Sequence, residues 1–233
     1  MPEVAPNPEL LRSLGRLVRG LSALFWGLPF TTVVCVQAAK TDFFHSYGIS
    51  PPVLVTGWLV IGVWLLGAFQ PQERIWQRAL DRCLILALIN FGLSPFIFWW
   101  KQSPGEPYGV VVVGVLALTG VLFLSSLNLV MLRLTAMLPD EHLRLETRQF
   151  TRLNRSLLMI VIFLGVVLGV ILQNPQLVPP PYEIPVMLRE TGLWVLIFMV
   201  LPPLAMTMAM LWKIKEVIMD SVFGGGTAGR IRH

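Results

Sequence analysis

Polar side chains stand inside long apolar stretches of the sequence, where they could form hydrogen bonds. They include Gln37, Asn90, Ser94, Thr119, Ser125, Ser126 and Asn128. Four of them are singled out as candidates: Asn90, Ser94, Ser125 and Asn128. In lipid, amides and hydroxyls commonly hydrogen-bond between helices. The same groups also suit the lining of a path for a neutral or small solute. Both interpretations stay open, and the four residues form the candidate polar cluster.

Two members of this cluster are predicted to meet. Asn90 lies eight residues after Arg82, and Ser125 lies eight residues before Arg133. At a rise of 1.5 Å per residue, both lie about 12 Å inward from these charges. We therefore predict that Asn90 and Ser125 share a hydrogen bond within one helical hairpin.

A second group with chemical potential is a stripe of arginines that recur at helical spacing: Arg144, Arg148, Arg152 and Arg155. An apolar stripe runs beside it: Leu143, Phe150, Leu153 and Leu157. A helix with one basic and one apolar face is typical of a membrane interface. The stripe is a candidate site for anionic lipid headgroups or a protein partner. The alternative is that the arginines only set the orientation of the chain.

Metal and catalytic chemistry have little support. Asp42 and His45 are spaced like neighbours on a helical turn, with Tyr47 nearby, but two ligands do not make a metal site and a polar loop is the favoured interpretation. The long apolar segments contain no ionisable residue. Such residues mark proton relays and voltage sensors. We expect no catalytic residue, no cofactor and no bound metal, and we do not expect an enzyme.

The composition favours a membrane protein. Hydrophobic residues make up 55% of the 233 residues and charged residues only 13%, against roughly a quarter charged in soluble domains. The net charge of +5 does not indicate nucleic-acid binding, because the basic residues flank apolar runs rather than forming one patch on a soluble domain.

The elements that position these residues are six apolar segments. A helix needs roughly 20 apolar residues to cross a membrane. The segments are Leu21–Ala39, Pro52–Phe69, Cys83–Trp100, Gly109–Leu132, Ser156–Leu172 and Thr191–Trp212. The predicted fold class is an all-α, polytopic integral membrane protein with six transmembrane helices arranged as three hairpins.

The basic residues predict the orientation. Lys and Arg in short loops are retained on the cytoplasmic side. With the N-terminus inside, the inner segments hold fifteen of the eighteen basic residues, and the outer loops hold only Lys40, Lys101 and Arg189. We therefore expect both termini to be cytoplasmic, in a cell (inner) membrane.

The inner segments share a layout. Each starts with a proline (Pro8, Pro71 or Pro139), continues with an acid and then carries arginines three or four residues apart. Proline and acids are signals of a helix start. We predict a short cytoplasmic amphipathic helix before each hairpin, running on into the first span of that hairpin. The whole chain, 1–233, is then one transmembrane domain with a possible threefold repeat of 8–70, 71–138 and 139–212, followed by a cytoplasmic tail of 213–233.

Small residues predict close helix packing in the third hairpin. Gly165 and Gly169 are four residues apart, as are Ala205 and Ala209. Such pairs let two helix backbones approach closely.

Three function classes remain. The first is a non-catalytic subunit or scaffold of a membrane complex, whose partners are membrane lipids and other membrane protein subunits or a second copy of the chain. The second is a permease or channel component that moves a neutral or small solute. The third, an enzyme at the membrane surface, has no supporting motif. The short loops and the absence of charged residues in the spans favour the first class.

Overall fold

The computed structural model describes residues 8–40, 50–70, 72–98, 107–138, 141–173 and 183–223, and this part of the chain is helical. The helices are α1 (Pro8–Lys40), α2 (Pro51–Leu66), α3 (Arg74–Leu93), α5 (Pro107–Met137), α6 (Glu141–Gln173) and α7 (Glu183–Phe223). Five helical ranges are long and apolar enough to cross a membrane, and α2, with 16 residues, is apolar but shorter. The all-helical prediction is confirmed for the described residues, and the six-span hairpin arrangement stays a prediction.

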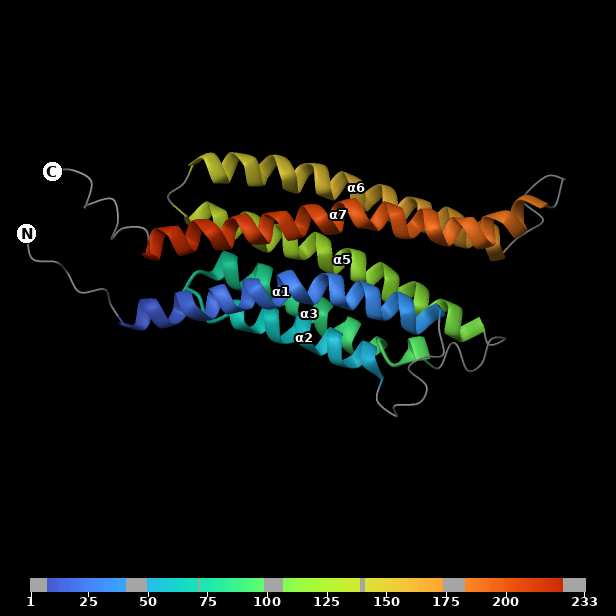
Figure 1. Ribbon diagram of the computed structural model, residues 1–233, viewed down its shortest axis with the longest axis horizontal. Coiled ribbons are helices and arrows are strands. Elements are labelled where there is room, and N and C mark those ends of the chain that lie inside the picture. Colours follow the sequence, from blue (N-terminus) through green and yellow to red (C-terminus); the bar gives the residue numbers. More distant parts are fainter. Residues whose placement is uncertain are drawn as a thin grey trace, which may run out of the picture.

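The helices run alternately up and down and pack in chain order. Each packs against the next, α7 also packs against α1, and the described helices thereby close into a ring. In Figure 1, α1, α2 and α3 lie on one side of the bundle, and α5, α6 and α7 lie on the other. Helix α1 begins and α7 ends at the same end of the bundle. We call it the basic end, because the arginine-rich first turns of α1, α3 and α6 lie there.

The basic segments run on into the apolar parts of α1, α3 and α6, as predicted. In α1 and α6 they form the first turns of one continuous helix of 33 residues. No proline interrupts the chain between these turns and the apolar part, so the helix has no reason to break. The first segment starts at Pro8 as predicted, whereas α3 starts at Arg74, with Glu73 rather than Pro71 at its N-terminal boundary. Only the predicted helix start at Pro71 is corrected.

The turn from α2 to α3 is closely packed. Gln70 has a positive φ of 43°, which lets the chain reverse within a few residues. Trp76 is fully buried, its Nε1 donates a hydrogen bond to the Phe69 carbonyl at 3.0 Å, and the two rings meet edge to face. The Gln77 side chain donates to the Gly67 carbonyl at 3.4 Å. These contacts hold the start of α3 beside the end of α2.

Apolar side chains fill the bundle in the half nearest the basic end. The largest fully buried side chains there include Leu21 of α1, Leu66 of α2, Trp76 of α3, Leu127 of α5 and Leu211 of α7. They belong to one contiguous cluster. Because interiors of this kind pack to near-crystalline density, the cluster fixes how the helices sit against one another.

Glycines allow close packing between α1 and α2, not within the third hairpin. A Cβ on Gly20 would lie 3.0 Å from the carbonyl oxygen of Gly62, and a Cβ on Gly27 would lie 2.8 Å from a methyl group of Leu59. In contrast, Gly169 has no neighbour within 4 Å in the space that a Cβ would enter. Ala205 and Ala209 are exposed. The prediction that small residues pack inside the third hairpin is therefore wrong for Gly169, Ala205 and Ala209.

Helix α7 continues past Trp212, where the last apolar segment was predicted to end. It runs to Phe223, and Ile214 and Ile218 are buried. The first part of the predicted tail is therefore a packed helix.

Candidate functional site

The polar cluster predicted from the sequence is divided among several helix interfaces. Asn90 of α3 is buried, and its carbonyl oxygen accepts a hydrogen bond from the Thr119 hydroxyl of α5 at 3.0 Å. Its amide nitrogen donates to the Leu86 carbonyl of its own helix at 2.8 Å. Asn90 thus links α3 to α5.

Ser94 lies at a different interface. It is fully buried at the end of α3 and lies 3.2 Å from the Thr56 hydroxyl of α2. The one hydroxyl hydrogen of Thr56 is shared between Ser94 and the Pro52 carbonyl, which lies at 2.7 Å, and Ser94 donates to the Phe91 carbonyl at 2.8 Å. This pair joins α2 to α3.

The predicted bond between Asn90 and Ser125 is wrong, because Asn90 bonds to Thr119 instead. A second bond fixes the register, since Cys83 shares a side-chain hydrogen bond with Ser126. Cys83 and Asn90 are seven residues apart along α3, and their partners Ser126 and Thr119 are seven residues apart in the opposite direction along α5. The same register sets Arg133 level with Trp76 rather than with Arg82. The depth estimate failed because it set Arg82 level with Arg133, whereas this register places Arg82 level with Leu127, nearer the middle of α5.

Asn128, the fourth predicted residue, belongs to a junction of three helices. Asn128 of α5, Asn154 of α6 and Thr207 of α7 are each at most 2% exposed. The amide nitrogens of Asn128 and Asn154 lie 3.2 and 2.9 Å from the Thr207 hydroxyl. The Pro203 carbonyl accepts from Asn154 at 3.2 Å and from Thr207 at 2.8 Å. This polar junction is the most highly connected polar group among the described residues.

The polar junction contains acceptors that the protein does not satisfy. The side-chain oxygen of Asn154 and the hydroxyl of Thr151, one turn away on α6, are buried without a hydrogen-bond partner. A buried polar atom without a partner costs on the order of 1–3 kcal/mol. A water molecule with two or more polar neighbours would remove this cost.

A polar seam continues from the junction toward the basic end between α6 and α7. Thr147 is 2% exposed and lies two turns before Asn154. Beyond it, Lys213 of α7 donates to the carboxylate of Glu146. His142 Nδ1 lies 3.7 Å from the same carboxylate. This seam lies between α6 and α7. Its side chains are charged near the basic end and uncharged near the polar junction.

The arginine stripe lies on the outer side of α6. Arg144, Arg148, Arg152 and Arg155 are all exposed. The apolar stripe beside it is divided: Leu143 is 2% exposed and Phe150 packs against the core, whereas Leu153 is 59% exposed. The exposed stripe has the accessibility that a lipid headgroup or a protein partner requires.

Positive charge is concentrated at one end of the bundle. Thirteen basic side chains lie in the half of the bundle nearest that end: Arg12, Arg16, Arg19, Arg74, Arg78, Arg82, Arg133, Arg144, Arg148, Arg152, Arg155, Lys213 and Lys215. Lys40 ends α1 at the opposite end of the bundle. The charge asymmetry predicted along the sequence is thus also present in space over the described residues.

The other candidates do not add a site. Asp42, His45 and Tyr47 lie outside the described residues. Across the ranges that the structure describes, no three His, Cys, Asp or Glu residues are grouped as metal ligands. Comparison with known protein families, curated proteins and solved structures found no match.

Sequence reasoning missed two residues of the polar junction. Asn154 stands among the arginines just before the fifth apolar segment, and so outside the stretches in which polar residues were considered. Its spacing from Thr147 and Thr151, seven and three residues, places the three on one face of α6. That polar face beside the arginine stripe was the available signal. Thr207 carried no comparable signal, since a single threonine inside an apolar helix commonly bonds to its own backbone.

Proposed function

We propose that the protein is a multi-pass membrane protein that serves as a non-catalytic subunit or scaffold of a membrane complex. It resides in the cell (inner) membrane with both termini on the cytoplasmic side. Its partners are membrane lipids and other membrane protein subunits or a second copy of the chain.

The observation that carries this proposal is the use of the interior polar side chains. Asn90, Ser94 and Asn128 each hydrogen-bond to a residue of a neighbouring helix. One contiguous cluster of apolar side chains packs between the helices near the basic end. Polar groups that link helices across a packed core suit a static structural part better than a solute path.

The orientation rests on the basic end. Basic residues near the ends of spans are retained in the cytoplasm, and thirteen of them lie in the half of the bundle nearest the basic end. This end also holds the start of α1 and the end of α7. The two termini therefore belong on the cytoplasmic side.

Helix α6 offers the surface for a partner. Only 17% of the most apolar stretch of α6 is buried inside the bundle, against 39% of the corresponding stretch of α5. Met159, Phe163 and Val166 are each more than half exposed. Lipid or another membrane helix would cover this face, and a helix bound there would leave the rest of the bundle unchanged.

Site-specific crosslinking in the native membrane tests the proposal. A photoreactive benzoylphenylalanine at Phe163, which is 68% exposed, should yield a crosslinked protein of defined mass. The same group at Leu158, which is 2% exposed, serves as the matched control and should not. A product of twice the chain mass identifies a second copy. Crosslinks to lipid alone would contradict the scaffold role.

A second candidate function is a permease or channel component for a neutral or small solute. The unpaired oxygens of Asn154 and Thr151 favour it, because a solute donor could bind them. Solute flux into liposomes containing only the purified chain would establish this function. Flux that Asn154→Leu abolishes without unfolding the chain would assign it to the polar junction.

A further inference from the structure

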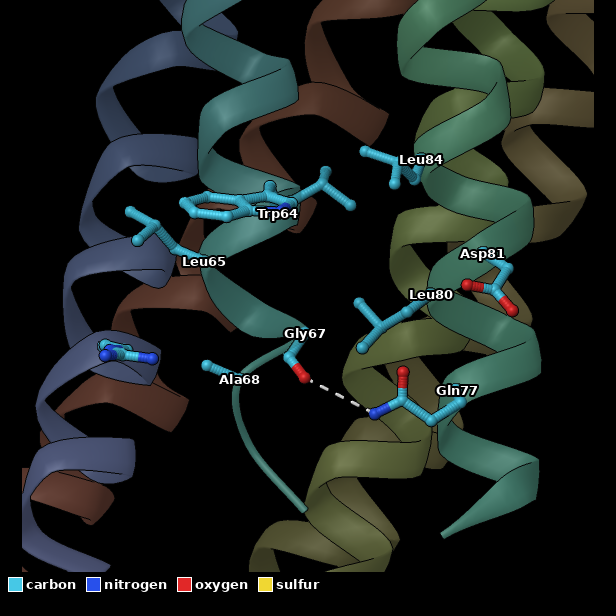
Figure 2. Close-up of a pocket in the computed structure, with 10 residues that line it drawn as sticks. Trp64, Leu65, Gly67, Ala68, Gln77, Leu80, Asp81 and Leu84 are labelled. Atoms are coloured by element: carbon cyan, nitrogen blue, oxygen red, sulfur yellow. Dashed lines mark hydrogen bonds between the residues drawn. The ribbon is translucent and has the colours of Figure 1, made fainter. Parts of the chain in front are cut away.

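A groove of about 610 Å³ lies at the basic end, beside the C-terminal end of α2. It is bounded by α1, α2 and α3, and it exists because α2 stops at Leu66 while α1 continues past it. In Figure 2, Gln77 reaches toward the Gly67 carbonyl, and Leu80 and Leu84 extend from α3 toward α2. Its volume is within the range of small-ligand sites, about 300–1,000 Å³.

The groove is polar at one end and apolar at the other. Arg16 of α1 and Gln77 and Asp81 of α3 line it close to where the predicted spans begin, whereas Trp64 of α2 and Leu84 of α3 line it further into the bundle. Trp64 is 69% exposed, and tryptophan favours the level of lipid headgroups. A ligand with a charged head and an apolar body would match this change from a polar to an apolar lining.

The charged lining residues are available to such a ligand. Arg16 and Asp81 are both exposed, and neither forms an ion pair with another described residue. They stand on different helices on either side of the end of α2. The amide nitrogen of Gln77 is used by Gly67, so its carbonyl oxygen remains as an acceptor beside Asp81, one helical turn away.

We propose that this groove binds a phospholipid whose headgroup carries both a phosphate and a primary ammonium, that is, a phosphatidylethanolamine. Arg16 takes the phosphate, because guanidinium groups match phosphate oxygens. Asp81 and the Gln77 carbonyl accept hydrogen bonds from the ammonium. Trp64, Leu65 and Leu84 contact the glycerol and the first acyl carbons. The proposal depends on membrane placement with the basic end at the headgroups, but not on the scaffold role.

The acid in the groove selects this lipid over two others. A phosphatidylglycerol offers Asp81 hydroxyl donors but no cation, so no positive charge offsets its phosphate beside the Asp81 carboxylate. A phosphatidylcholine has a cation but no N–H group, so Asp81 and Gln77 lose their hydrogen bonds. The surrounding arginines alone would favour an anionic lipid, so the choice of headgroup reports specifically on Asp81.

Native mass spectrometry of the full-length chain, purified in detergent, tests the assignment. The probes are phosphatidylethanolamine, phosphatidylcholine and phosphatidylglycerol with identical acyl chains. The wild type should bind the ethanolamine lipid roughly threefold more tightly than either of the others, the size expected of one exposed charge pair. Asp81→Asn should remove this preference and raise binding of the glycerol lipid, whereas Arg16→Gln should weaken all three.

Matched variants keep the result interpretable. Glu216→Gln removes an exposed acid at the same end of the bundle and outside the groove, and it should leave the preference intact. Leu84→Trp fills the apolar end of the groove and should weaken all three lipids. Equal binding of ethanolamine and choline lipids by the wild type would overturn the proposal. So would an unchanged preference in Asp81→Asn, or tighter binding of the glycerol lipid by the wild type.

Discussion

At the scale of single residues, amide side chains determine which helices are joined. Asn154 reaches two acceptors on α7, the Pro203 carbonyl and the Thr207 hydroxyl. A leucine in the same place would pack but could not distinguish α7 from any other apolar helix. Hydrogen bonds of this kind average about 0.6 kcal/mol in membranes and reach about 1.7. These hydrogen bonds therefore contribute more to the choice of which helices pair than to the total stability of the bundle.

Asn154→Leu should lower the free energy of unfolding by about 0.6–1.7 kcal/mol, because both bonds to α7 are lost. Removal of the unpaired Asn154 oxygen offsets part of this loss. Chemical unfolding in one defined detergent provides the measurement. Gln149→Leu, on the exposed side of the same helix, is the control and should change little. Unchanged stability in Asn154→Leu would show that the polar junction does not hold α6 to α7.

At the scale of helices, α1 and α2 form the most closely packed pair. Gly20 and Gly62 bring the two backbones into contact, and two long-range bonds reinforce them: Trp58 Nε1 donates to the Ala23 carbonyl at 3.0 Å, and the Thr31 hydroxyl donates to the Val55 carbonyl at 3.1 Å. Helix α2 has only 16 residues. We infer that its contact with α1 holds it in place.

Gly20→Ala should destabilise the protein by about 1–3 kcal/mol. The added Cβ would meet the Gly62 carbonyl oxygen at 3.0 Å, and a backbone atom cannot move aside cheaply. Gly92→Ala is the matched control, since nothing lies within 4 Å of its Cβ position, and it should be neutral or slightly stabilising. Thermal unfolding of both variants in the same detergent makes the comparison. Equal melting temperatures would argue against the close contact of α1 with α2.

The arginine stripe on α6 gives a second prediction at this scale. If headgroups bind the stripe, changing both Arg148 and Arg152 to Gln should lower thermal stability in anionic nanodiscs, by roughly 2 kcal/mol at most. Neutral nanodiscs should show almost no effect, because no anionic headgroup is present. Equal losses in both lipids would leave orientation or a protein partner as the reason for the stripe.

At the scale of the whole molecule, the sequence was sufficient for the parts that depend on local pattern. The helical class, the apolar stretches and the basic end all follow from composition and spacing. Partners across interfaces did not follow, because they depend on helix register. Asn90 was assigned to Ser125 rather than Thr119 since the relative heights of α3 and α5 are set by packing. The close glycines could not be distinguished from Gly169, which faces open space, for the same reason.

The central claim is a bundle that crosses the membrane with its basic end in the cytoplasm, and cysteine labelling tests it directly. In a chain without Cys35 and Cys83, single cysteines are placed at His142 and Ser103. His142 is 88% exposed at the start of α6, whereas the nearby Thr147 is 2% exposed and would resist labelling from either side. In intact cells an impermeant thiol reagent should label Ser103→Cys and spare His142→Cys, which should react only after the membrane is permeabilised. Labelling of His142→Cys in intact cells, with Ser103→Cys protected, would contradict the orientation and the account built on it.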